Sequence, residues 1–214
     1  CFYPGDFLLM EAHQVYSVGE LIVYGGTGVC EVEAVETKSI DGEEKQYYRL
    51  RPLYQSGTIS APVNGKVFMR PVISHEEADA IIDSLPEIPA QTLHERNFTQ
   101  LAAHYQQLLC SHECSDIAGL VVSIRAKKLE SERSGRRFGQ IDAKFMKLAE
   151  KLLYGEFSAA LGIPFEEVEK EFRAQLTFLK EMGAKIIGAS EQSHSVQGQQ
   201  DVPVFGHKYA MNDE

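Results

Sequence analysis

Three glycines stand together directly after an apolar run, which is how many phosphate-binding loops begin. Gly25, Gly26 and Gly28 follow the residues LIVY at 21–24. A phosphate loop must lead into a helix, because the first backbone amides of that helix hold the anion. The residues after Gly28 instead read VCEVEAVE, which predicts a strand and carries three carboxylates. The stretch therefore predicts a tight turn between two strands, where glycine supplies the positive φ.

A second candidate is the set formed by Cys110, His112 and Cys114, whose thiolates and imidazole could bind zinc. The spacing differs from the usual two-residue spacing, and His94 or His104 would have to complete the site. We therefore expect no metal, and a zinc-dependent protein built on Cys110 and Cys114 is a less favoured alternative. No Ser-His-Asp or Cys-His arrangement stands in a recognisable catalytic context, so we expect neither a cofactor nor enzymatic activity.

Charge is distributed unevenly along the chain. The net charge is −10 over 214 residues, and residues 15–90 account for −6. Residues 125–151 carry +5, which makes them a basic island in an acidic protein. The basic residues of this island are Arg125, Lys127, Lys128, Arg133, Arg136, Arg137, Lys144, Lys147 and Lys151.

The spacing within the island suggests a ridge that could follow DNA phosphates. Arg125 and Lys128 are three residues apart, on one helix face. Three arginines crowd the loop at 131–139, and the lysines from 144 onward recur at helical spacing. Phosphate contacts of this kind are salt-dependent because they release counterions. The alternative is that the lysines simply solvate a helix, and nothing predicts base-specific reading.

The elements that position these residues fall into two groups. Residues 18–73 predict five short strands, at 20–24, 29–36, 46–51, 58–63 and 67–72, and hence a small barrel or a strongly bent sheet. From Ser74 the pattern becomes helical, with a capping box formed by Ser74 and Glu77. Prolines at 86 and 89 mark a linker. Four more apolar stripes predict a helical bundle, and the polar residues after 188 predict a disordered tail. The expected fold is α+β.

The strand region also carries a family resemblance. VGELIVY at 18–24, Gly28-Val29, Glu36, Gly42, Tyr47-Tyr48 and Ala61-Pro62-Val63 resemble the CarD family of bacterial RNA-polymerase-binding transcription regulators. KLLYGEF at 151–157 and ALGIP at 160–164 are similar to the end of the family's helical domain. The resemblance runs from about Tyr16 to Phe172.

This resemblance implies that the two halves of the chain bind different partners. A Tudor-like barrel at 15–74 would bind the β subunit of RNA polymerase, partly by adding a strand to a sheet. A helix and linker at 75–89 would lead to a helical domain at 90–183 that contacts promoter DNA and modulates open-complex stability. Residues 1–14 would be an N-terminal extension and 184–214 a disordered tail. Family members are not enzymes.

The resemblance also implies site residues. Lys38 keeps the family's cation at its position, although it could equally be a solvated lysine beside a turn. Ser60 stands where the family has an arginine, and it remains a candidate polymerase contact by position, together with Ile59. Family members wedge a tryptophan against DNA, but this chain has no tryptophan. Phe98 could be a smaller wedge. Its place in a stripe with Leu101 and Tyr105 favours core packing.

The sequence thus predicts a cytoplasmic, monomeric regulator with no membrane contact. It would bind the polymerase β subunit through its barrel and promoter DNA weakly and without sequence specificity. The candidate DNA contacts are Phe98, Arg125, Lys128, Arg133, Arg136, Arg137, Lys144 and Lys147. The alternative is a protein-interaction adaptor that uses the barrel and makes no direct DNA contact.

Overall fold

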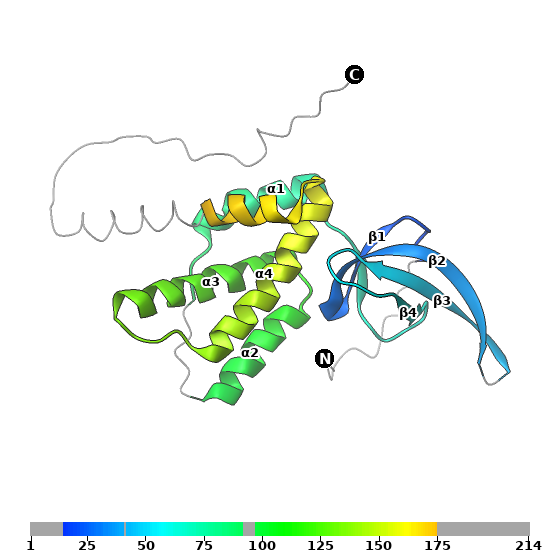
Figure 1. Cartoon of the computed structure of the whole chain (residues 1–214), viewed down its shortest axis with the longest axis horizontal. Coiled ribbons are helices and arrows are strands. Elements are labelled where there is room, and N and C mark those ends of the chain that lie inside the picture. Colours follow the sequence, from blue (N-terminus) through cyan, green and yellow to red (C-terminus); the bar gives the residue numbers. More distant parts are fainter. Residues whose placement is uncertain (1–14, 41, 92–96, 175–214) are drawn as a thin grey trace, which may run out of the picture.

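The computed structural model of the chain describes residues 15–40, 42–91 and 97–174. The extension expected at 1–14 and the tail expected at 184–214 lie outside these residues. The fold is α+β, with an antiparallel sheet followed by helices, as predicted (Figure 1). Within the described ranges, every helix is too short or too polar to span a membrane.

The five predicted strands are all present. They are β1 (Leu21–Tyr24), β2 (Gly28–Ile40), β3 (Glu43–Pro52), β4 (Ile59–Pro62) and β5 (Met69–Pro71). Their order in the sheet is β4-β3-β2-β1-β5, and every neighbouring pair is antiparallel. The glycine-rich stretch is a single 3-10 turn, η1 (Gly25–Thr27), between β1 and β2, so the predicted turn is confirmed. Gly25 and Gly28 both have positive φ, 44° and 90°.

The sheet does not close into the predicted barrel. Its outer strands, β4 and β5, do not pair with each other in the described chain. β5 has three residues and ends at Pro71, which has no N–H to donate to a further ladder. The register of β2 against β3 shifts between Val32 and Ala34, where an extra residue increases the twist. The result is a strongly bent open sheet, the other shape that the strand pattern allowed.

The helices follow the predicted apolar stripes. They are α1 (His75–Ser84), α2 (Phe98–Cys110), α3 (Cys114–Arg133) and α4 (Gln140–Leu161), and residues 165–174 are helical as well. The capping box at the start of α1 is confirmed, because Ser74 accepts from the Glu77 N–H while Glu77 accepts from the Ser74 N–H. A 3-10 turn, η2 (Leu85–Glu87), follows α1 where the linker was expected.

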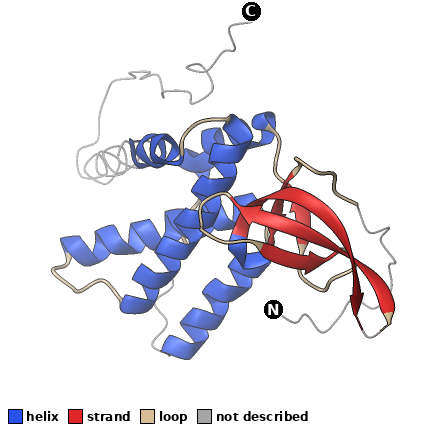
Figure 2. Cartoon of the chain, turned by 45° about the vertical axis from the view of Figure 1, so that its right-hand side comes forward, coloured by secondary structure: helices blue, strands red, loops and turns tan. Residues whose placement is uncertain are grey.

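Among the described residues the core consists of two hydrophobic clusters, one formed by the sheet and one by the helices. The helical cluster includes α1, whose Ile82 is buried, and the helix at 165–174 through Phe172. The sheet lies against one side of the bundle and α4 passes beside it (Figure 2). There Gly155 of α4 meets Tyr54 so closely that an added Cβ would lie 3.0 Å from the tyrosine ring. A larger residue at this position would force the Tyr54 ring to shift, so glycine allows this close approach of helix to sheet.

Candidate functional site

The β4 edge of the sheet is the first candidate surface. Within the described residues β4 pairs with β3 alone, from Tyr47 opposite Pro62 to Leu50 opposite Ile59. The other side of β4 therefore presents backbone donors and acceptors to any strand that approaches. Strand addition uses such groups for affinity and side chains for selectivity.

The structure brings Lys38 and Ser60 together beside this edge. The Lys38 ammonium donates to the Ser60 hydroxyl at 2.7 Å, reaching across β3 from β2 to β4. It also lies 5.3 Å from the centre of the Tyr47 ring and 3.8 Å from Glu36. The Lys38 side chain remains 40% exposed, so a partner can still reach its charge. Ile59 packs toward the sheet's hydrophobic cluster and is half-buried.

The second candidate surface is the end of the bundle that faces away from the sheet. Figures 1 and 2 both place the start of α2 and the turn between α3 and α4 at this end. Phe98 is the first residue of α2 and is 71% exposed. The expectation that Phe98 packs into the core is therefore wrong. Its helical stripe is buried from Leu101 onward, but the first turn of α2 extends past the neighbouring helices.

Five cations of the basic island are exposed near this end: Arg133, Arg136, Arg137, Lys144 and Lys147. Arg136 donates to the Ser134 hydroxyl at 2.9 Å and lies 3.1 Å from Glu130, yet its side chain is 65% exposed. The side chains of Arg133 and Arg137 have no hydrogen bond or ion pair to the part of the chain that the structure describes. We call Phe98 together with these five cations the distal surface.

Two other cations of the island form ion pairs inside the bundle. Arg125 pairs with Glu150 and donates to the Tyr154 hydroxyl at 2.9 Å, which leaves its side chain 21% exposed. Lys127 pairs with Asp142 at 2.9 Å. Spacing along a helix could not reveal this, since both acids come from α4. Lys128 is half-buried on the same helix. The positive charge that remains for a partner is smaller than the sequence count suggests.

The acid that pairs with Lys127 also ties three helices together. Asp142 of α4 is 4% exposed and accepts from the Tyr105 hydroxyl of α2 at 2.8 Å, while Lys127 belongs to α3. Burial and the neighbouring carboxylate raise the pKa of Tyr105, so its hydroxyl stays protonated and donates. This contact fixes the start of α4 against α2 and α3, which carry the distal surface.

Of the residues considered for zinc, Cys114 and His112 contact other side chains. Cys114 donates to Glu156 at 3.1 Å, and burial together with that carboxylate raises the pKa of the Cys114 thiol, which opposes the thiolate that zinc needs. The His112 ring stacks on Phe68 with centroids 4.4 Å apart. Glu156 lies at the junction of sheet and bundle, and the sequence analysis missed it. Its signal was a lone charge within an otherwise apolar stretch of helix.

Comparison with known proteins gives two kinds of match. Short stretches are similar to inosose dehydratases: 57% identity over 51 residues with that of Clostridium beijerinckii (24% of this chain, 17% of that protein), and 52% over 59 residues with that of Clostridium perfringens (27% and 20%). The inosose dehydratase of Geobacillus thermodenitrificans is 49% identical over 59 residues, again 27% and 20%. The chain spans about a fifth of the length of these curated relatives.

The second match concerns the sheet. Residues 16–73 match the family described as CarD-like/TRCF RID domain, a domain that interacts with RNA polymerase. They include all five strands and end at the residue before the α1 cap. The resemblance inferred from the sequence is confirmed over this range: residues 16–73 of the chain are a member of the CarD-like/TRCF RID domain family.

Proposed function

We propose that the protein is a non-enzymatic transcription regulator that binds the β subunit of RNA polymerase along β4. The match of residues 16–73 to an RNA-polymerase-interacting domain carries this proposal. The geometry supports it, because β4 is an open edge with the cation Lys38 beside it. A polymerase strand added there would extend the sheet, and an acidic side chain next to it would meet the lysine.

The same proposal places promoter DNA at the distal surface. Phe98 offers a largely exposed apolar ring, and apolar side chains of this kind can insert at an unstacked base step. Arginines at the neighbouring turn supply charge for phosphates. Contact of both kinds at the edge of melted DNA would lengthen the lifetime of the open complex. Polymerase supplies the local concentration that an acidic protein needs to reach DNA.

Binding to polymerase is tested first, by calorimetry of the full chain against polymerase and against its isolated β subunit. The variant Lys38→Glu should weaken binding about 10-fold, which corresponds to about 1.4 kcal/mol, because it brings a like charge to an acidic partner. Lys170→Glu is the matched control, since Lys170 is exposed and lies on the helix at 165–174 in the other half of the molecule. No binding of the wild-type chain would overturn the proposal.

The DNA contact is tested separately. Arg136→Glu combined with Arg137→Glu should shorten the lifetime of the polymerase–promoter complex and leave polymerase affinity unchanged. Equal lifetimes for the double variant and the wild type would remove these arginines from the interface.

The adaptor is the second candidate, and one observation favours it. Arg125 and Lys127 are committed to ion pairs within the bundle, so less charge is available for DNA. An adaptor would bind polymerase and leave the footprint on promoter DNA unchanged. A salt-dependent extension of the footprint at the edge of the melted region would exclude it.

A further inference from the structure

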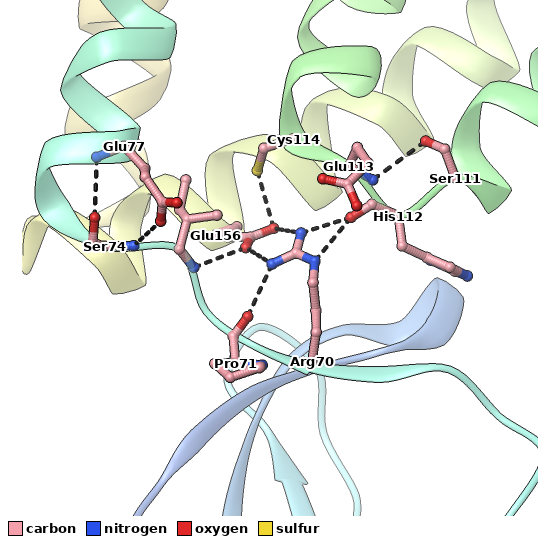
Figure 3. Close-up of polar contacts among 10 residues, drawn as sticks. Arg70, Pro71, Ser74, Glu77, Ser111, His112, Glu113, Cys114 and Glu156 are labelled. Carbon is pink, nitrogen blue, oxygen red and sulfur yellow. Dashed lines mark hydrogen bonds and ion pairs between the residues drawn. The ribbon is translucent and has the colours of Figure 1, made fainter. Parts of the chain in front are cut away.

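A buried ion pair joins the sheet to the bundle. Arg70 of β5 and Glu156 of α4 are 86 residues apart in the chain, and their side chains are 16% and 4% exposed. Figure 3 shows the arginine reaching from the strand into the space between the helices. Both acceptor sides of the carboxylate face the guanidinium, with one contact at 2.8 Å between Nη2 and Oε2.

The ion pair also makes hydrogen bonds to the chain around it. Arg70 donates from Nε and Nη2 to the His112 carbonyl at 3.0 and 2.7 Å. Glu156 also accepts from the Ile73 N–H at 3.2 Å and from the Cys114 thiol at 3.1 Å (Figure 3). These donors come from the end of the sheet and the start of α3. One carboxylate and one guanidinium therefore connect four segments of the chain.

The turn between α2 and α3 is adapted to the same contact. His112 has φ of 59°, which a residue with a side chain seldom adopts. In this conformation the His112 carbonyl accepts a hydrogen bond from Arg70, and the His112 ring stacks on Phe68 at an interplanar angle of 9°. A strained backbone conformation of this kind persists where the surrounding contacts hold the residue in place.

Directional contacts and apolar contacts fix orientation to different degrees. Apolar surfaces attract without a preferred direction, so two bodies held by them can rotate against each other. A bidentate arginine–carboxylate pair has a fixed planar geometry, and a buried pair that loses its geometry leaves uncompensated charge. The pair therefore specifies one orientation of the sheet relative to the bundle.

We propose that Arg70 and Glu156 are positioning residues that hold the β4 edge and the distal surface in one fixed relation. This inference rests on the proposed function, because the relation matters when one partner occupies both surfaces. Polymerase bound at β4 would then place Phe98 and the arginine turn at a set point on the DNA. Without the pair, each surface keeps its own binding groups but loses its alignment with the other.

The first experiment measures the orientation itself. Spin labels are introduced at Lys45 and Ser134 of the full chain through unnatural amino acids, because the chain has four cysteines of its own. Both positions are exposed, one on the sheet and one at the turn after α3. The wild type should give one narrow distance distribution by pulsed electron resonance. Glu156→Gln should broaden it at least twofold, and an unchanged distribution would overturn the inference.

A second variant separates orientation from stability. Arg70→Met combined with Glu156→Leu fills the junction with apolar groups, and such replacement of a buried ion pair is often neutral or stabilising. This double variant should unfold at least as late as Glu156→Gln in urea and still give the broad distribution. A double variant with the narrow wild-type distribution would show that packing alone sets the orientation.

Polymerase binding and promoter-complex lifetime are measured for the same two variants. Both variants should bind polymerase within twofold of the wild type, yet shorten the promoter-complex lifetime at least fivefold relative to it. Wild-type lifetimes in both variants would overturn the positioning role. If the wild type itself does not bind polymerase, the proposed function fails, and the distance distributions alone then decide whether the pair positions the two halves.

Discussion

The salt dependence of the polymerase–promoter complex tests the distal surface most directly. Arg133 and Arg137 are exposed and have no ion pair within the described chain, so they are available to phosphates. Each phosphate contact contributes about 0.9 to the slope of log K against log salt. Replacing both by glutamine should therefore lower the slope contributed by the protein by about 1.8. Between 50 and 200 mM salt, two such contacts change the equilibrium constant about 10-fold.

The assay is a titration of open-complex formation with KCl, with and without saturating protein. The matched control is Lys45→Gln with Lys66→Gln, which removes the same charge from exposed positions on the sheet side. The control should keep the wild-type slope. If the arginine variant also keeps it, these side chains do not contact phosphates, and the distal surface is not a DNA interface.

Three further predictions follow from individual residues. Phe98→Ala should shorten promoter-complex lifetime without lowering the melting temperature, because the ring is exposed; Val18→Ala, at a 63% exposed residue, is the control and should change neither. Gly155→Ala should destabilise the fold by about 1–3 kcal/mol because its Cβ would meet Tyr54. Gly119→Ala, whose Cβ would meet nothing closer than 3.9 Å, should instead stabilise the fold by about 0.5–1 kcal/mol. Both free energies of unfolding are measured in urea, and equal values for the two variants would contradict the close contact between Gly155 and Tyr54. Burial and the charge of Arg70 lower the pKa of His112, so the folded state binds fewer protons than the unfolded state and stability should fall as pH drops below about 6.5. His112→Asn should reduce that fall in urea titrations at pH 5.5 and 7, and an unchanged fall would place its origin elsewhere.

Local patterns predicted the elements well because each element is decided by nearby residues. Alternation and turn residues defined the strands, and the helical stripes defined the buried faces, down to the Ser74 capping box. The glycine turn was recognisable because the residues after Gly28 are strand residues rather than helix residues. Local patterns do not show whether an outer strand pairs with another strand and closes the sheet. The short β5 and its terminal Pro71 left the sheet open, which composition alone did not show.

Contacts between segments that are distant in the chain could not be predicted from the sequence. The stripe that begins at Phe98 predicted which face of α2 is apolar, but not that its first residue lies past its neighbours. The basic island predicted a charged surface, yet Arg125 and Lys127 meet acids that only the fold brings to them. The pair of Arg70 and Glu156 depends on two segments that approach after folding. A single charge between buried residues of α4 was the one local indication.

The two edges of the open sheet are not equivalent, and this limits stoichiometry. The β5 edge is three residues long, ends in a proline, and sends Arg70 into the bundle. The β4 edge runs along the outside of the sheet and has its proline at the last position. Of the two outermost strands, β4 is therefore the one that offers its backbone groups to a further strand. A partner that adds a strand at β4 would bind one-to-one through the outermost strands, and these two strands would not bridge two copies of it.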